Sequence, residues 1–206
     1  RDSSTSRGLG DVYKRQPLHT VDINDAGLRS SVQNGILNTE LGIPFRTPAE
    51  GHNVAFTSLW DNYPDSLEIP LKGKASRAYL LMAGSTNHMQ CHIDNGVIRI
   101  YYKDGTRDVM FLRNPDNWPP IEHIFFEDGL AFNRHTPALY RLRLKTGEIS
   151  NNFGEELGFP GASRELDGGA AVLLEMPLNP GKKLSHLVLE TLSNDVVIGL
   201  MSITLQ

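Results

Sequence analysis

Two short segments of this sequence place aromatic rings among side-chain amides and carboxylates, one near residue 60 and the other near residue 117. The candidate residues are Trp60, Asp61, Asn62, Tyr63, Asn117 and Trp118. An aromatic face packs on the apolar C–H side of a sugar ring, while planar amide and carboxylate groups hydrogen-bond its hydroxyls. The two segments therefore predict weak carbohydrate binding. In the alternative, both tryptophans fill the ends of the fold and the polar residues form turns, because large aromatic side chains are mostly buried.

Motifs for catalysis, phosphate binding and metal binding are incomplete. Ser85 lies in a segment that lacks the second glycine of a nucleophile elbow, and Gly168-Gly169 has no strand-to-helix context. His88 and His92 are four residues apart, but the glutamate of the helical zinc-hydrolase motif is missing. The acidic residues in loop-like segments are Asp61, Asp65, Glu122, Glu127 and Asp128. The sequence does not show two of them facing each other, as glycoside hydrolysis requires. We expect no catalytic residue, no metal site and no cofactor.

The composition excludes several classes of protein. The 206 residues carry a net charge of −4 without a dense run of lysine and arginine, so nucleic-acid binding is not expected. No apolar run approaches the roughly 18 residues that span a bilayer, so a membrane is not expected as a partner. Cys91 is the single cysteine, which rules out an intrachain disulfide.

Residues 1–16 are rich in serine, glycine and arginine and show neither a strand period nor a helix period. They resemble the translated sequencing-adaptor peptide that precedes many unrelated environmental open reading frames. We therefore expect a non-native or disordered tail whose deletion leaves thermal unfolding unchanged. On this interpretation the chain is a fragment of metagenomic origin, and its native N-terminus, with any signal peptide, lies upstream.

From residue 17 onward, short apolar runs alternate with turn-forming residues, which is typical of an antiparallel β-sandwich or jelly roll. The expected strands cover residues 21–23, 53–59, 66–71, 77–85, 89–94, 97–102, 107–113, 139–145, 171–176, 184–192 and 196–205. Residues 146–170 are expected to form a long loop. No linker divides this part of the chain, so residues 17–206 are expected to form a single all-β domain.

Two dipeptides predict hairpin turns within this series of strands. Asn95-Gly96 and Asp104-Gly105 each lie between apolar runs, and two-residue hairpin turns favour such residues because they tolerate positive φ. The two turns would join three neighbouring strands into a meander.

Alternation of residue types predicts which face of two later strands is buried. In residues 184–192, Leu187 and Leu189 are expected to point inward, with His186 and Glu190 outward. In residues 139–145, leucines alternate with tyrosine and arginine, so one dry face and one wet face are expected.

Several short phrases occur in an order that resembles a known kind of domain. They are Gly-Ile-Pro-Phe at 42–45, LEIPL at 67–71, Gly-Lys-Ala at 73–75, AYLLMA at 78–83, YKDGT at 102–106, Asn-Trp at 117–118 and the final run at 196–205. This order resembles the galactose-binding-like jelly roll beside six-hairpin, rhamnosidase-type catalytic domains of bacterial polysaccharide-degrading proteins. It is most similar to a domain of unknown function that ends such chains. The resemblance covers roughly residues 20–206.

The resemblance implies a non-catalytic accessory domain, because the catalytic acids of such proteins lie in the separate helical barrel. It supplies no catalytic residue to this chain, and it implies a structural role for the strand that ends in YKDGT. The implied partner is the neighbouring catalytic domain of the same parent chain, with a glycan as a further partner. The implied location is the periplasm or the outside of a bacterium.

Three functions remain open at this point. The chain is an accessory sandwich packed against a catalytic domain, an autonomous carbohydrate-binding module, or a small jelly-roll enzyme that acts on carbohydrate. The fold alone does not choose among them. An accessory domain should expose an apolar patch, and a binding module should show aromatic rings in a solvent-facing groove. An enzyme should show titratable groups that converge in a pocket.

Overall fold

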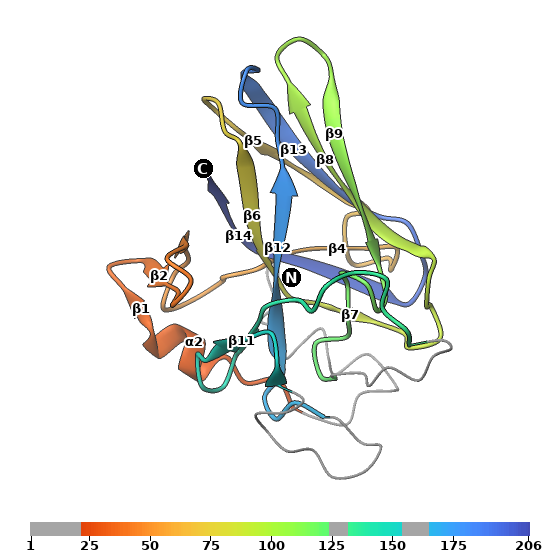
Figure 1. Ribbon diagram of the computed structural model, residues 1–206. Helices are drawn as coiled ribbons and strands as arrows, with labels where there is room; N and C mark the ends of the chain where they lie inside the picture. Colours follow the sequence, from red (N-terminus) through yellow and green to blue (C-terminus); the bar gives the residue numbers. More distant parts are fainter. Residues whose placement is uncertain (1–21, 124–131, 154–164) are drawn as a thin grey trace.

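The computed structural model describes residues 22–123, 132–153 and 165–206, which fold mainly into antiparallel β-sheets (Figure 1). The tail expected at residues 1–16 lies outside the described residues. Helix α2 (Ala26–Ser30) leads into a three-stranded sheet in the order β1-β2-β3. These strands are β1 (Val32–Gln33), β2 (Ile36–Asn38) and β3 (Pro44–Arg46). No helix among the described residues is long and apolar enough to cross a membrane.

Two larger sheets form the body of the structure. A seven-stranded sheet has the order β11-β10-β12-β6-β14-β4, and β7 also pairs with β14. Its strands are β4 (Ala55–Ser58), β6 (Arg77–Met82), β7 (Ser85–Thr86), β10 (Arg141–Arg143), β11 (Ile149–Ser150), β12 (Ala170–Pro177) and β14 (Val196–Leu205). A four-stranded sheet has the order β5-β13-β8-β9. Its strands are β5 (Ser66–Pro70), β8 (Asp94–Tyr102), β9 (Arg107–Arg113) and β13 (Leu184–Thr191). The predicted all-β, antiparallel sandwich class is confirmed.

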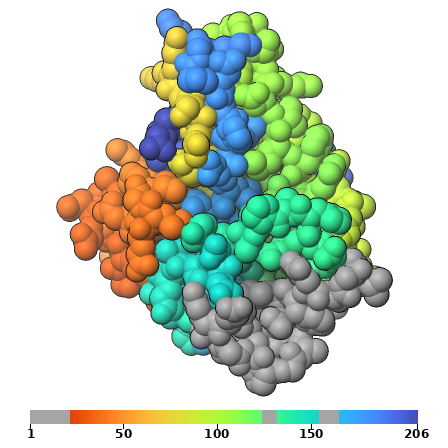
Figure 2. Space-filling view, in the orientation of Figure 1, coloured from red at the N-terminus to blue at the C-terminus, as the bar shows by residue number. Residues whose placement is uncertain are grey.

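The seven-stranded sheet is buried on both faces. One face packs against the four-stranded sheet and forms the first core, which includes Leu80, Met82, Ile98, Leu174, Leu187 and Ile198. The other face packs against α2 and the β1–β3 sheet and forms the second core, which includes Leu28, Leu37, Phe45, Leu81, Leu173 and Val197. In Figure 2 this N-terminal part, coloured orange, lies beside the yellow and blue strands. Burial on both faces explains why β6, β12 and β14 are nearly continuous apolar runs.

The later strands agree closely with the sequence prediction. Strands β12, β13 and β14 cover nearly the residues expected at 171–176, 184–192 and 196–205. In β13, Leu187 and Leu189 are fully buried in the first core, while both neighbours expected to point outward remain partly exposed. The face assignment of this strand is therefore confirmed.

The predicted turn at Asn95-Gly96 is wrong, because both residues lie inside β8 and are buried. Gly96 does not have a positive φ, and residues 89–93 form no named strand, so the expected three-stranded meander is a two-stranded hairpin of β8 and β9. A Cβ built on Gly96 would lie 2.2 Å from Ile198 Cδ1 of the opposite sheet. The glycine therefore permits close packing of the two sheets rather than a reversal of the chain. The turn at Asp104-Gly105 is confirmed, with φ of 84° at Gly105.

Three other expectations need correction. The strand expected at 139–145 is shorter, and Arg141 on its expected wet face is only 6% exposed. Of residues 21–23, Ile23 forms an isolated bridge to Gly168, and Val21 lies outside the described residues. The stretch 146–170 contains β11, and its residues 154–164 lie outside the described part of the chain.

Candidate functional site

One of the two tryptophans in the predicted sugar-binding segments lies in the protein interior. Trp118 is 1% exposed and belongs to the first core. The neighbouring Asn117 side chain holds a turn: its Oδ1 accepts a hydrogen bond from the Arg113 N–H (2.7 Å), and its Nδ2 donates to the Phe111 carbonyl (2.8 Å). The Trp118 ring presents no face to a ligand in this structure, so Trp118→Ala would test core packing rather than sugar stacking.

The other predicted segment keeps more of its surface accessible. Trp60 and Tyr63 are partly buried and pack against the second core, with ring centroids 6.4 Å apart. Asp61 and Asn62 are exposed. Trp118 lies in the first core and Trp60 packs against the second core, on opposite faces of the seven-stranded sheet. The six predicted residues therefore lie in two separate regions and do not form one site.

A groove of about 720 Å³ lies beside β4, β5 and the C-terminal half of β14. Its main apolar lining residues are Phe56, Leu67, Ile69, Leu71, Leu200 and Ile203. Tyr63 also lines it and is the one residue of the predicted sugar-binding set that does. At the rim, Asn53 Nδ2 donates a hydrogen bond to Asp25 Oδ2 (3.1 Å), so that amide is already engaged within the protein.

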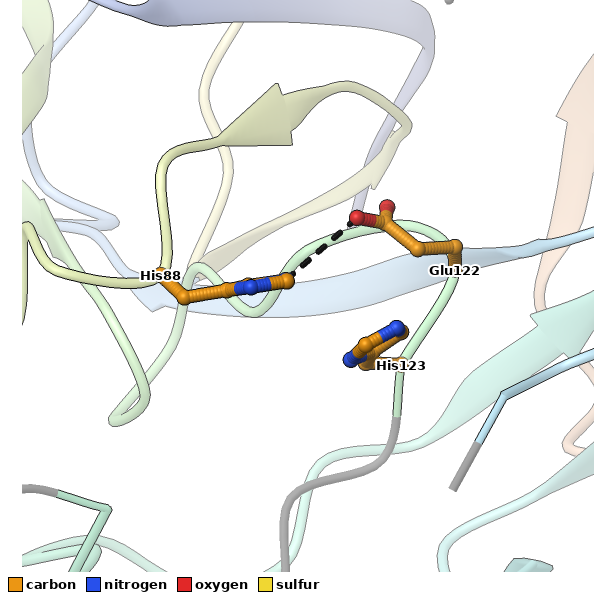
Figure 3. A group of neighbouring side chains, drawn as sticks. All are labelled: His88, Glu122 and His123. Carbon is orange, nitrogen blue, oxygen red and sulfur yellow. Dashed lines mark ion pairs between the residues drawn. The ribbon is translucent and has the colours of Figure 1, made fainter. Parts of the chain in front are cut away.

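A cluster of two imidazoles and one carboxylate lies apart from this groove and shares no lining residue with it. This inner cluster consists of His88, Glu122 and His123, whose possible ligand atoms all lie within 4.8 Å of one another. His88 Nε2 is 3.4 Å from Glu122 Oε1, and the two imidazole rings stack with centroids 4.6 Å apart. Figure 3 shows the three side chains pointing toward one another from two different loops.

The loop that carries His88 follows β7 and is held by buried side chains. Asn95, the residue first expected in a turn, instead donates from Nδ2 to the Gln90 carbonyl (3.2 Å) and accepts from Thr86 Oγ1 (2.8 Å). The His88 carbonyl accepts a hydrogen bond from Cys91 Sγ (2.8 Å). These contacts fix the backbone from which the imidazole projects.

The segment that carries Glu122 and His123 is held by the buried guanidinium of Arg141. Arg141 Nη2 donates to the carbonyls of Pro120 (2.9 Å) and Ile121 (3.3 Å), and Nη1 donates to the carbonyl of His123. The Glu122 carbonyl in turn accepts from the Leu166 N–H (2.6 Å). Five fixed donors suit a set of converging carbonyl oxygens, which explains an arginine in the interior at β10.

Burial affects the protonation of His123 in this cluster. Burial lowers the pKa of His123 from its ordinary value, and the neighbouring His88 and Arg141 act in the same direction, whereas Glu122 opposes them. A lowered pKa keeps the imidazole neutral near pH 7, which is the form that binds metals. The Glu122 side chain is only 2% exposed. The inner cluster can offer one imidazole nitrogen each from His88 and His123 and one carboxylate oxygen from Glu122.

A second group with the same donor types lies nearer the surface. This outer cluster consists of His92, Asp116 and His135. Asp116 Oδ2 is 4.0 Å from His92 Nδ1 and 3.7 Å from His135 Nδ1, and the side chain of His135 is 64% exposed. Asp116 Oδ1 already accepts a hydrogen bond from the His135 N–H (2.7 Å).

The four-residue spacing of His88 and His92 made them candidates for one metal-binding pair, but the structure places them in two different clusters. Their partners come from residues 24 to 43 positions further along the chain, a spacing that no local motif contains. The sequence signal for the inner cluster is the adjacent Glu122-His123 pair, which directly follows an apolar and proline-rich run. The sequence patterns indicate Glu122 only as a possible glycosidase acid, and they do not indicate His123 or His135.

Comparisons with models of protein families, with curated proteins and with solved structures found no match to this chain. The resemblance based on the order of sequence phrases therefore remains a hypothesis. The function is inferred from the geometry of the groove and of the clusters.

Proposed function

We propose that this chain is a non-catalytic accessory domain of a polysaccharide-degrading, glycoside hydrolase-type protein, and that it packs against a neighbouring catalytic domain. The observation that supports this proposal most directly is the apolar groove beside β4, β5 and β14. A groove lined mainly by apolar side chains at the edge of a sheet is a candidate interaction site.

The groove lies beside the part of β14 that continues beyond its pairing with β4. Strand β14 pairs with β4 only over Val197–Leu200, and the groove continues along Met201–Leu205 beyond that pairing. On the other side lies β5, the edge strand of the four-stranded sheet. Ile69 and Ile203 are only partly buried and face this opening. An apolar segment of the neighbouring domain could pair with the edge strand β5 and would remove these side chains from water.

A protein segment fits the lining better than a glycan does. Sugar recognition needs planar hydrogen-bonding groups around an accessible aromatic face. Here the floor is made of leucine, isoleucine and methionine side chains, Phe56 is only 7% exposed, and the Asn53 amide is engaged with Asp25.

The test uses the catalytic domain encoded upstream in the intact reading frame, produced separately and titrated with this chain by calorimetry. We expect association that Ile69→Glu weakens at least about tenfold, because a charge would enter the apolar contact. Val109→Glu is the matched control, since Val109 is exposed on β9 at the far edge of the same sheet. Absence of association with the wild-type chain, or equal weakening by both variants, would contradict the docking proposal.

Carbohydrate binding is the second candidate, and the position of Tyr63 in the groove favours it. A site of one accessible ring and a few hydrogen bonds would be weak, with Kd of about 1 mM, equivalent to about 4 kcal/mol. Titration against a panel of plant and host polysaccharides should then show binding that Trp60→Ala or Tyr63→Ala reduces. The same panel tests the enzyme alternative, because turnover of any glycan by the pure chain would refute the non-catalytic role.

A further inference from the structure

We propose that His88, Glu122 and His123 form a binding site for one divalent transition-metal ion, with Zn²⁺ as the probe. The site shares no residue with the groove, so this proposal and the docking proposal can fail independently. Two imidazoles and one carboxylate are a recurrent protein donor set for zinc and for other first-row divalent ions.

One of the three donor separations already matches the coordination geometry of such an ion. Two ligands bound at about 2.1 Å to a tetrahedral Zn²⁺ lie about 3.4 Å apart. His88 Nε2 and Glu122 Oε1 are 3.4 Å apart. The remaining separations are at most 4.8 Å, and rotation of the His123 imidazole about its side-chain bonds can shorten them. Three protein ligands would leave a fourth position for water or for an anionic group.

Burial gives the carboxylate a physical reason to bind a cation. Removing an ionised carboxylate from water is costly unless positive charge or hydrogen bonds compensate it. Glu122 is 2% exposed, and its Oε1 lies 3.4 Å from His88 Nε2. A divalent ion bound between the carboxylate and the two imidazoles would place positive charge next to this buried side chain.

The backbone around the cluster is fixed before any ion binds. Arg141 holds the carbonyls on both sides of Glu122, and Asn95 holds the loop of His88. These contacts restrict the backbone positions from which the three donor side chains project. The outer cluster lacks this shielding, because His135 is largely exposed. It provides a control with the same donor types in a solvated setting.

The experiment is a calorimetric titration of chelator-treated protein with Zn²⁺, followed by thermal unfolding with and without the ion. The reference protein carries His92→Ala and His135→Ala, so that the outer cluster does not contribute. We expect this reference to bind one equivalent of Zn²⁺ and to unfold at a higher temperature when loaded. With Co²⁺ in place of Zn²⁺, the visible absorption should indicate a nitrogen and oxygen ligand set.

Two substitutions in the reference protein then test the assignment. Glu122→Gln keeps the size of the buried side chain, and His88→Ala alters a loop position that is 23% exposed. Each should weaken Zn²⁺ binding at least about tenfold and abolish the thermal shift, because each removes one of the three proposed ligands. His186→Ala, on the outer face of β13, should leave the affinity unchanged.

Circular dichroism identifies any variant that fails to fold. If either Glu122→Gln or His88→Ala does not fold, the other variant tests the ligand assignment. The proposal is overturned if the reference protein binds no Zn²⁺. It is also overturned if folded Glu122→Gln and His88→Ala variants bind as tightly as the reference, or if all binding by the wild-type chain disappears on removal of the outer cluster.

Discussion

At Gly96 the backbone of β8 lies so close to β14 that even a methyl group does not fit. A Cβ there would lie 2.2 Å from Ile198 Cδ1 and 3.0 Å from the Glu190 carbonyl oxygen. Ile198 is fully buried, so its terminal methyl has little room to move. At Gly105 the constraint is different, because φ is 84° and nothing lies within 4 Å of the position of a Cβ.

A double-mutant cycle distinguishes the close contact at Gly96 from the backbone conformation required at Gly105. Gly96→Ala should lower the free energy of unfolding by about 1–3 kcal/mol through overpacking. Ile198→Val removes the methyl group that clashes, so Gly96→Ala should cost at least about 0.5 kcal/mol less in that background. The measurement is the denaturant midpoint of the four proteins in the cycle.

Gly105→Ala serves as the control for this cycle. It should cost about 1–2 kcal/mol because of its backbone conformation, and the cost should be the same with Ile198 or Val at position 198. An effect of Ile198→Val on Gly105→Ala as large as on Gly96→Ala would refute the close-contact explanation.

The two dipeptides also show where sequence patterns stop being informative. Asn-Gly and Asp-Gly favour the same turn, yet only Asp104-Gly105 forms one. Burial distinguishes them: Asn95 uses its amide inside the fold, whereas Asp104 caps a solvent-exposed hairpin. Local propensity does not contain that tertiary information.

At the scale of single elements, β13 has the central position in the four-stranded sheet. It pairs with β5 on one side and β8 on the other, and its inward leucines meet the seven-stranded sheet. The period-2 alternation made this strand predictable. The site-bearing loops were not predictable in the same way, because Glu122 and His123 are positioned by Arg141, a residue that alternation assigned to solvent.

Leu187→Ala tests the inward face of β13. The residue is fully buried, so the free energy of unfolding should fall by about 2–5 kcal/mol. His186→Ala on the outer face loses a partly exposed stacking contact with Tyr101 and a hydrogen bond between Nδ1 and Ser185 Oγ (3.1 Å), and should cost about 1 kcal/mol or less. Chemical denaturation of both variants provides the measurement. Equal losses for the two would be inconsistent with the assigned faces.

The β8–β9 hairpin carries a carboxylate whose ionisation is favoured by folding. Hydrogen bonds from the Thr106 hydroxyl and N–H, together with Lys182, lower the pKa of Asp104 from 3.8 to about 2. A depressed folded pKa contributes stability above the unfolded value and loses it as pH falls through the folded value. The hairpin should therefore weaken on acidification between these two values.

Asp104→Asn isolates this contribution, because the amide keeps an acceptor oxygen but has no charge. The wild-type chain should be the more stable one near pH 7, with a small difference since the group is exposed. The difference should shrink as pH falls from about 4 to about 2. Denaturation curves of both proteins across this range provide the check, and a difference that does not change with pH would contradict it.

At the scale of the whole molecule, both cores depend on the same strands. β6, β12 and β14 contribute alternate side chains to the first core and to the second core. Damage to either core therefore weakens the sheet that the other core needs. This sharing is the physical basis for expecting residues 17–206 to unfold as one cooperative unit.

The two tryptophans allow each core to be observed separately. Trp118 lies in the first core and Trp60 packs against the second, so Trp60→Phe and Trp118→Phe each leave one fluorescent reporter. Leu187→Ala damages the first core and Leu37→Ala the second, each by about 2–5 kcal/mol. In a cooperative unit, either leucine substitution shifts the fluorescence transition of both reporters to the same midpoint, coincident with circular dichroism. If Leu37→Ala shifted only the Trp60 signal and Leu187→Ala only the Trp118 signal, the chain would consist of two independent units, and the single-domain assignment would be wrong.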